Sequence, residues 1–344
     1  MTPLAGFADR LVAWQRQHGR HDLPWQVSDP YAVWVSEIML QQTQVDTVIP
    51  YYVRFLARFP DLASLAEAPE DAVLALWSGL GYYARARNLH AAAKRVLADH
   101  GGVFPGDVAA IAALPGIGRS TAAAIAAFAF GGRHAILDGN VKRVFCRLFG
   151  VDGWPGEKAV ETALWHLAEA LLPEREIVPY TQGLMDLGAT LCRRSRPDCP
   201  CCPFADDCVA CRDGRQAELP AARPRKGLPE RSTVMLVLRH GGEILLEKRP
   251  PSGIWGGLWS LPECAPGDDP VAAARRLGYS AEPLAELPGL SHTFSHFRLA
   301  IRPVALAVAR RAPGAGEPGA LWLAPADAVQ AALPTPVRRI IAAL

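Results

Sequence analysis

Four cysteines lie in one short segment and have the residue type and spacing of a metal site. The residues between successive cysteines number six, two and five, in a stretch rich in Arg, Pro and Asp: Cys192, Cys199, Cys202 and Cys208. Four thiolates at such distances can enclose one metal centre, either a [4Fe–4S] cluster or a structural zinc ion. Zinc ribbons usually have two separated Cys-x-x-Cys pairs, and this segment has one, so the spacing favours the cluster.

The remaining four cysteines are interpreted as bystanders. Cys201 has the residue type and position to replace one of its neighbours as a ligand, but we expect it to stand beside the cluster, as we expect of Cys211. Cys146 and Cys264 are predicted to be ordinary buried residues.

Two carboxylates have surroundings that suit two different chemical roles. Glu37 stands among the apolar residues of segment 34–40, which should raise its pKa, whereas Asp138 stands in a glycine-containing loop and should stay ionised. Such a pair can protonate a leaving group and stabilise a cation. The alternatives are that Glu37 is an exposed helix acid and that Asp138 is a helix N-cap.

A glycine turn precedes a strongly apolar segment. Residues 114–118 have the sequence Leu-Pro-Gly-Ile-Gly, and the following residues 120–130 are rich in Ala, Ile and Phe and are predicted to form a packed helix. Two glycines around one aliphatic residue permit a sharp turn whose backbone N–H groups can bind a phosphate. Ordinary turn chemistry is the alternative for such a short motif.

The elements that position these residues are predicted to be helical over residues 7–212. Apolar residues recur at three- and four-residue spacing, and Gly, Pro and Asp separate the segments, without strand-like alternation. The clearest periodic segments are 7–14, 33–40, 48–55, 72–76 and 89–97.

Beyond this region the pattern changes to an α+β domain. Residues 213–231 contain Pro, Arg, Lys and Gly and are predicted to be a linker. Segments 233–238 and 243–248 have strand composition and are separated by His-Gly-Gly, which predicts a hairpin. Segments 270–277 and 335–344 are predicted helices, and segment 299–308 a strand. We therefore divide the chain into a helical domain at 1–212, the linker at 213–231 and an α+β domain at 232–344.

Bulk properties limit the classes of partner. The 344 residues carry a net charge of only +2, so binding to a polyanion must depend on local clusters. Segments 85–95, 142–147 and 193–196 contain such basic clusters. Neither a secretory signal nor an apolar run of about 18 residues is found, which predicts no membrane association and a cytoplasmic, reducing location. Cysteines there are better metal ligands than disulfide partners.

The chain resembles the helix-hairpin-helix DNA glycosylase superfamily, represented by endonuclease III, in three motifs and their order. These are the glycine turn, the acid of Leu-Asp-Gly-Asn-Val at 137–141 and the four-cysteine loop. The resemblance covers about residues 7–210. It implies that Gly116 and Gly118 clamp a DNA phosphate, that Asp138 is catalytic, and that the four cysteines of 192–208 hold one [4Fe–4S] cluster.

Two features distinguish the chain from endonuclease III and resemble the MutY family of adenine-specific mismatch glycosylases. Ser120 stands where endonuclease III has its lysine nucleophile, and a serine cannot form the Schiff base that strand cleavage by β-elimination requires. Segment 34–45 is similar to the MutY signature. The resemblance implies that Glu37 is the general acid and that Gln42 enters the DNA base stack.

The resemblance also implies further contacts to DNA. The turn at 79–83 is similar to the family's intercalating element, with Tyr82 able to wedge between bases after the target base has left the duplex. The DNA-contacting and base-binding set implied in this way also includes Arg20, Trp25, Leu80, Ser120, Asn140, Lys142 and Gln182.

The C-terminal domain resembles the start of a Nudix, or MutT-like, domain at 247–250 and 254–262. The clustered acids that hold magnesium in Nudix hydrolases are not found after residue 262, so we expect a recognition domain without hydrolase activity. Segment 290–296 resembles the MutY loop that touches 8-oxoguanine. Phe294, Ser295 and His296 are placed at its tip, where hydroxyl and imidazole groups can hydrogen-bond a base edge.

Together these observations predict a monofunctional glycosylase that initiates base excision repair by hydrolysing adenine from A:8-oxoguanine or A:G mispairs. We expect a monomer that binds duplex DNA and is associated with the nucleoid. One rival is a bifunctional glycosylase/lyase for oxidised pyrimidines, disfavoured by Ser120. Other rivals are an iron–sulfur DNA-binding redox sensor, which would not need two paired carboxylates, and a Nudix hydrolase, which would need the missing acids.

Overall fold

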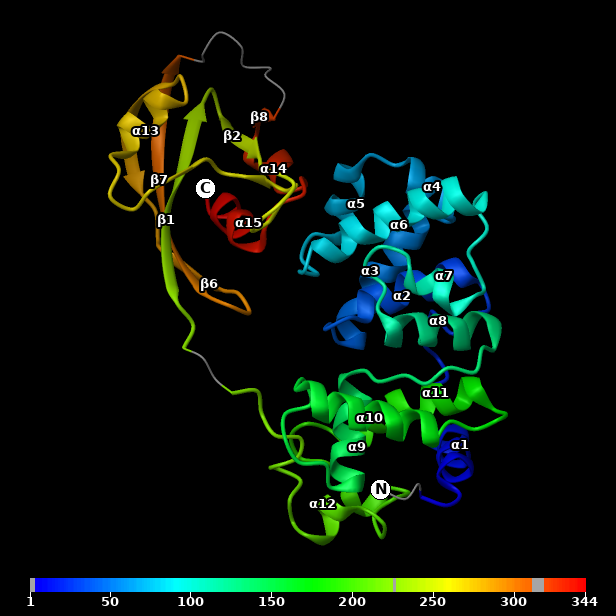
Figure 1. Cartoon of the computed structure of the whole chain (residues 1–344). Coiled ribbons are helices and arrows are strands. Elements are labelled where there is room, and N and C mark those ends of the chain that lie inside the picture. The colour runs from blue at the N-terminus through cyan, green and yellow to red at the C-terminus, as the bar shows by residue number, and fades with distance from the viewer. Residues whose placement is uncertain (1–3, 225–226, 311–318) are drawn as a thin grey trace. The chain divides into compact units, whose positions relative to one another are not determined.

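The chain forms two compact units in the computed structural model, which describes residues 4–224, 227–310 and 319–344. One unit comprises residues 1–66 and 91–225, and the other comprises residues 67–90 and 226–344 (Figure 1). Most of the predicted linker lacks regular structure up to Pro229, and its residues 225–226 lie outside the described residues.

The first two thirds of the described chain are helical, as predicted. Each periodic segment falls within a helix, and longer helices extend it on one or both sides. The α-helices are α1 (Phe7–His18), α2 (Pro30–Leu40), α3 (Val45–Arg58), α4 (Leu62–Glu67), α5 (Glu70–Trp77), α6 (Ala84–His100), α7 (Val108–Ala112), α8 (Arg119–Phe130), α9 (Gly139–Phe149), α10 (Lys158–Ala170), α11 (Ile177–Asp186) and α12 (Val209–Arg212). A π-helical turn (Leu187–Leu191) and a 3₁₀ turn (Cys199–Cys201) lead into the cysteine segment.

The core of the first unit joins helices that are far apart in sequence. Phe7 of α1 stacks on Phe204 at 4.6 Å between ring centroids and meets Phe145 and Tyr180 edge-on, each at 6.3 Å. All four rings are at most 2% exposed. Burial of a large apolar side chain stabilises a fold by about 1.5–3 kcal/mol, so this cluster fixes the cysteine segment against α1, α9 and α11.

Helix α2 is the frame for Glu37 and is apolar almost all round. Asp29 caps its N-terminus by accepting hydrogen bonds from two backbone N–H groups, and Pro30 fits the first helical position. Trp34, Ile38 and Met39 are at most 2% exposed. A helix packed on all sides holds the direction of its few polar side chains closely.

The second unit contains a mixed β-sheet, with strands β1 (Glu230–His240), β2 (Glu243–Lys248), β3 (Trp259–Ser260), β4 (Glu263–Cys264), β5 (Ser280–Glu286), β6 (Leu290–Thr293), β7 (Arg298–Arg310) and β8 (Ala320–Leu323). Its main order is β3-β2-β1-β7-β5, and β1 and β7 pair in parallel. The predicted hairpin between β1 and β2 is confirmed, with His240 paired to Glu243. Gly241 and Gly242 have φ of 57° and 83°, which this tight turn requires.

Helices cover the sheet and complete the α+β architecture. They are α13 (Pro270–Arg276), α14 (Pro325–Ala328) and α15 (Thr335–Ala342). Leu236 and Leu238 of β1 pack in one core with Ala274 of α13, while the alternate residues Met235 and Val237 are fully buried too. Burial of successive residues shows that both faces of β1 are covered.

Segment 67–90 belongs to the second unit, although the sequence placed it in the helical domain. The Ser78 and Tyr83 hydroxyls both donate to the Leu333 carbonyl, at 2.9 and 3.2 Å.

Among the described residues, no helix is both long and apolar enough to cross a membrane.

Candidate active site

A cavity of about 450 Å³ opens between α1, α2 and α11. Four residues that the sequence assigned to catalysis or base binding line it together: Arg20, Trp25, Glu37 and Gln182. Its remaining lining is mostly apolar, including Leu40, Phe128 and Met185. A largely apolar cavity of this volume with a few polar groups has the form of a small-molecule binding pocket.

Glu37 supplies a protonated carboxyl to this cavity. It is half-buried on α2, and its neighbours Ser36 and Ile38 are at most 2% exposed. Burial, with a smaller contribution from the negative charge of Asp138, raises the pKa of Glu37 to about 8. The predicted shift is therefore confirmed in direction and cause, and the carboxyl carries its proton at neutral pH.

Asp138 is held in place as the N-cap of α9. Its Oδ1 accepts the Val141 N–H at 2.8 Å, and its Oδ2 accepts the Asn140 amide at 3.1 Å. Burial raises the pKa of Asp138 above its ordinary value, a shift that the glycine and asparagine next to it in the sequence did not predict. The N–H groups and the charge of Arg143 act in the opposite direction, and they favour the anion at this member of the pair. The capping role and proximity to Glu37 thus coexist.

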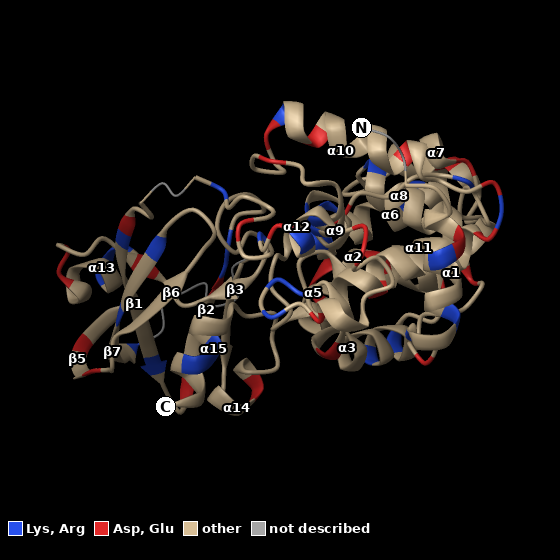
Figure 2. Cartoon of the chain, turned by 90° about the horizontal axis from the view of Figure 1, so that it is seen from below, with Lys and Arg blue, Asp and Glu red and all other residues tan. Residues whose placement is uncertain are grey.

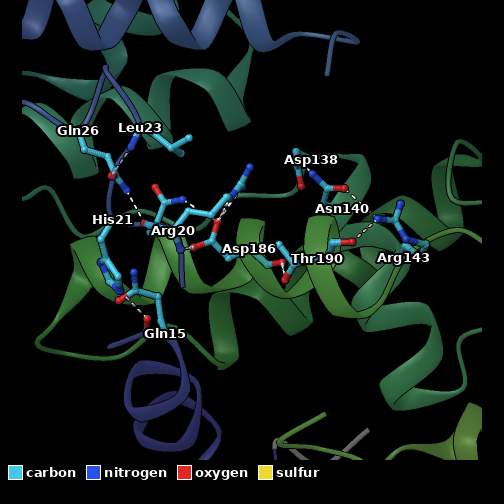
Figure 3. Close-up of polar contacts among 12 residues, drawn as sticks. Gln15, Arg20, His21, Leu23, Gln26, Asp138, Asn140, Arg143, Asp186 and Thr190 are labelled. Carbon is cyan, nitrogen blue, oxygen red and sulfur yellow. Dashed lines mark hydrogen bonds and ion pairs between the residues drawn. The ribbon is translucent and has the colours of Figure 1, made fainter. Parts of the chain in front are cut away.

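A chain of hydrogen bonds leads from Asp138 toward the cysteine segment. Figure 3 shows its first part, in which the Asn140 side-chain oxygen accepts from the Arg143 guanidinium at 2.9 Å. Arg143 Nε then donates to the Cys192 carbonyl at 2.7 Å. Arg143 also donates to the Gly188 carbonyl at 2.8 Å. The loop that carries Asp138 is therefore tied to the backbone that precedes the other cysteines.

The glycine turn forms a hairpin before α8, as predicted. Gly116 has φ of 78°, a conformation that favours glycine, and no protein atom lies within 4 Å of a Cβ placed on Gly118. The Ser120 hydroxyl accepts the Leu137 N–H at 2.9 Å and so positions the residue before Asp138. Sequence reasoning missed Gln41, whose amide donates to the Gly116 carbonyl and the Thr121 hydroxyl at 3.5 and 3.3 Å.

The residues proposed to enter the DNA stack lie on exposed turns. Gln42 follows α2, is exposed and has φ of 57°. Tyr82 is 54% exposed with φ of 50°, whereas Leu80 in the same turn is 6% exposed. Tyr82 is thus the residue of this turn that a partner can reach, and Leu80 belongs to the core. Lys142 forms an ion pair with Glu161 at 2.6 Å.

The cysteine segment surrounds a small cavity of its own. Its lining includes the four predicted ligands, Cys192, Cys199, Cys202 and Cys208. Cys211, which was expected to stand beside the cluster, lines the cavity as well, while Cys201 is exposed. Among the described residues, no group of three or more His, Cys, Asp or Glu side chains is arranged to hold a single metal ion. Five cysteines line this one cavity, and the four predicted ligands among them supply the number of thiols that a [4Fe–4S] cluster needs.

Arg147 adds a positive charge beside this cavity. It is 3% exposed and donates to the Cys192 thiol at 3.4 Å and to the Arg193 and Leu219 carbonyls at 2.7 and 2.8 Å. A buried guanidinium satisfied by carbonyls can stabilise the negative charge of thiolate ligands.

In the second unit, the predicted recognition residues lie in the turn between β6 and β7. Phe294 stacks on Phe297 at 4.5 Å, and its N–H donates to the Phe297 carbonyl at 2.9 Å. Ser295 and His296 are exposed, with the serine hydroxyl 3.4 Å from the imidazole Nδ1. The aromatic packing fixes the turn and leaves its two polar side chains available.

Acidic and basic residues are interspersed over both units (Figure 2).

The fold and the paired carboxylates define a DNA-repair glycosylase with an added Nudix-like domain. Residues 35–170 match the HhH-GPD superfamily of base excision DNA repair proteins, and residues 233–343 match the NUDIX domain. A thermostable thymine-DNA glycosylase structure covers 60% of this chain and 95% of its own, at TM-score 0.54 and 30% identity. An endonuclease III–DNA complex, at TM-score 0.52 and 21% identity, covers 60% and 94% and shows the same fold.

Full-length relatives narrow the class to one family. The adenine DNA glycosylase of Buchnera aphidicola subsp. Baizongia pistaciae is 37% identical over 99% of this chain and 97% of its own length. The human adenine DNA glycosylase is 34% identical over 99% of this chain and 74% of its own length. The chain belongs to the adenine DNA glycosylase family.

Proposed function

We propose that the chain hydrolyses the N-glycosidic bond of adenine mispaired with 8-oxoguanine or guanine in duplex DNA. The observation that carries the proposal is the protonated Glu37 carboxyl in a cavity large enough to admit a base. Glu37 lies close enough to Asp138 for the charge of Asp138 to raise the pKa of Glu37. The proposal assigns base excision to the first unit and recognition of the opposite base to the second.

The two carboxyls have different tasks in this reaction. Loss of a purine produces a cationic, oxocarbenium-like sugar and an anionic base, so one group must protonate the base while another stabilises the cation. Glu37 is suited to donate the proton because its pKa is about 8. Burial raises the pKa of Asp138, but the hydrogen bonds that it accepts from Val141 and Asn140 favour its anion and suit it to stabilise the cation.

The proposed path of the DNA uses the exposed turns of the structure. Target bases must leave the duplex before they can enter the cavity. We propose that the hairpin at Gly116 and Gly118 holds a phosphate and that Gln42 and Tyr82 fill the gap in the stack. Trp25, which meets Tyr52 edge-on at 5.4 Å, would form an aromatic wall of the base pocket.

A monofunctional reaction is favoured over a glycosylase/lyase. The Ser120 hydroxyl is engaged with the Leu137 N–H and has no amine to form a Schiff base. The nearby amine of Lys142 is held by Glu161 at 2.6 Å. These contacts support base release without efficient strand cleavage, and a redox sensor without catalysis would not need the carboxyl pair.

We infer that the four cysteines of 192–208 bind one [4Fe–4S] cluster. When bound, such a cluster would supply covalent cross-links that fix the loop, and Arg147 would stabilise the thiolate charge. The Arg143 side chain binds the backbone at Cys192 and Gly188 and the side chain of Asn140. The loop can in this way support the position of Asp138. We further propose that the protein acts as a monomer on nucleoid DNA.

Point variants of the turn between β6 and β7 test the recognition proposal better than deletion of residues 226–344. Ser78 and Tyr83 of segment 67–90 belong to the same unit and bind Leu333, so that deletion would remove their partner. We expect Ser295→Ala and His296→Ala to slow adenine release from A:8-oxoguanine more than from A:G. Ser291→Ala is the matched control, since Ser291 is an exposed serine of β6 outside the tip. Equal losses on both mispairs would contradict the recognition role.

A further inference from the structure

Asp186 is the last residue of α11, and its carboxylate is buried next to the base pocket. The reaction scheme above assigns no role to this carboxylate. The Asp186 side chain is 0% exposed. Its Oδ2 accepts the Arg20 backbone N–H at 2.9 Å, and its Oδ1 accepts Arg20 Nε at 2.7 Å (Figure 3). Oδ1 also lies 2.7 Å from Arg20 Nη2. A buried carboxylate needs such partners, because an unpaired charge in the interior is strongly destabilising.

The same carboxylate fixes the orientation of the Gln182 amide. Gln182 Nε2 donates to Asp186 Oδ1 at 2.9 Å across one turn of α11. An ionised carboxylate can only accept hydrogen bonds, so the NH₂ end of the amide must face it and the oxygen must occupy the other end. Gln182 lines the cavity, and among the described residues its oxygen has no hydrogen-bond donor. The amide therefore offers an acceptor to an occupant.

Arg20 is constrained in a complementary way. Its Nε and Nη2 are engaged by Asp186, which leaves Nη1 as the free end of a guanidinium that also lines the cavity. A guanidinium has donors alone. One buried carboxylate thus fixes the orientation of two neighbouring pocket side chains, so that Gln182 presents an acceptor and Arg20 presents a donor.

We propose that Asp186 is a positioning residue that gives the pocket its preference for 6-amino purines over 6-oxo purines. Adenine carries an amino donor beside the N7 acceptor, and this edge is complementary to one acceptor and one donor. Guanine and hypoxanthine carry an oxygen at the same position, which would face the Gln182 oxygen. The inference rests on the proposed function and adds the group that fixes base choice.

Removal of the negative charge should release this constraint. In Asp186→Asn the side chain can donate as well as accept, so the Gln182 amide can turn by about 180° and present its NH₂ to the pocket, because this terminal torsion is two-fold. A 6-oxo base then meets a donor in place of an acceptor. We expect the ratio of adenine release to hypoxanthine release to fall by roughly tenfold or more, as befits the loss of one oriented base contact.

The experiment compares single-turnover base release from duplexes with adenine or hypoxanthine opposite 8-oxoguanine, together with the Kd of each duplex. Thr190→Val is the matched control, since the Thr190 hydroxyl donates to the Asp186 backbone carbonyl at 2.8 Å and does not touch its carboxylate. We expect this control to keep the wild-type ratio. A general loosening of the helix end would lower both rates equally in both variants.

The outcomes separate the two proposals. A wild-type protein that releases adenine, with an unchanged ratio in Asp186→Asn, overturns the role of Asp186 alone. A wild-type protein that releases no adenine from the duplex with adenine opposite 8-oxoguanine overturns the proposed function. Where circular dichroism shows that Asp186→Asn is unfolded, Gln182→Met removes the same acceptor at similar volume, and an unchanged ratio in that variant also overturns the inference.

Discussion

Replacement of Glu37 by glutamine should abolish the acid step and leave the shape of the pocket intact. With a pKa of about 8 for Glu37, about nine tenths of the carboxyls are protonated at pH 7, against about 0.3% for a pKa of 4.5. Glutamine keeps the size and a hydrogen-bond donor but cannot transfer a proton. General acid catalysis contributes about 10²–10⁴-fold, so adenine release should fall by at least about 10²-fold.

The assay is single-turnover release of adenine from A:8-oxoguanine and A:G duplexes between pH 6 and 10. The protonated form acts as the acid, so the wild-type rate should fall by about tenfold from pH 7 to pH 9 as Glu37 ionises. Glu37→Gln should lack this decline and should bind the duplexes normally, because phosphate contacts supply much of the affinity. Near-normal turnover in Glu37→Gln, or the same pH decline in both proteins, would refute Glu37 as the acid.

Four further predictions concern other parts of the structure. Asp138→Asn should raise the barrier to adenine release by several kcal/mol, because the anion that faces the sugar cation is lost. The same assay measures this effect, and a rate close to that of wild type would contradict the role of Asp138. The purified protein should be brown and contain about four irons per chain, and stoichiometric zinc without iron after anaerobic purification would rule out the cluster. Ser120→Lys should gain strand cleavage and borohydride trapping, and robust trapping in wild type that persists after loss of Lys142 would contradict monofunctional chemistry. The pKa of Glu37 is raised from 4.5 to about 8 in the folded protein, so its protonated carboxyl stabilises the fold fully below pH 4.5, and this contribution is lost as pH rises through 8. The contribution to the free energy of unfolding is at most about 5 kcal/mol. The Tm of Glu37→Gln relative to that of wild type should therefore increase from pH 5 to pH 9.

The parts of the fold that the sequence predicted are those with strong local signals. Helices with apolar periodicity over several turns were predicted with their type and approximate bounds. The His-Gly-Gly turn specified its hairpin because two successive positive φ angles favour glycine. The pKa shift of Glu37 was predictable because the apolar residues that desolvate it are its own neighbours along α2.

Features that depend on tertiary contacts were not predictable in the same way. Strands β3 and β4 have two residues each, too few for an alternating pattern. The burial that raises the pKa of Asp138 was not predicted, because glycine and asparagine follow it directly in the sequence. Gln41 contacts the hairpin 75 residues away. Asp186 was accessible in principle, since it lies four residues after Gln182 and such pairs meet on one helix face.

The most direct test of the account is the identity of the released base and the state of the strand in one reaction. The protein is mixed in excess with a duplex containing a single A:8-oxoguanine pair, free bases are identified by mass spectrometry, and the strands are resolved on a denaturing gel before and after alkali. The account predicts free adenine and a strand that remains intact until alkali is added. Release of an oxidised pyrimidine from a control duplex without adenine release, or strand cleavage that keeps pace with base loss before alkali, would contradict it.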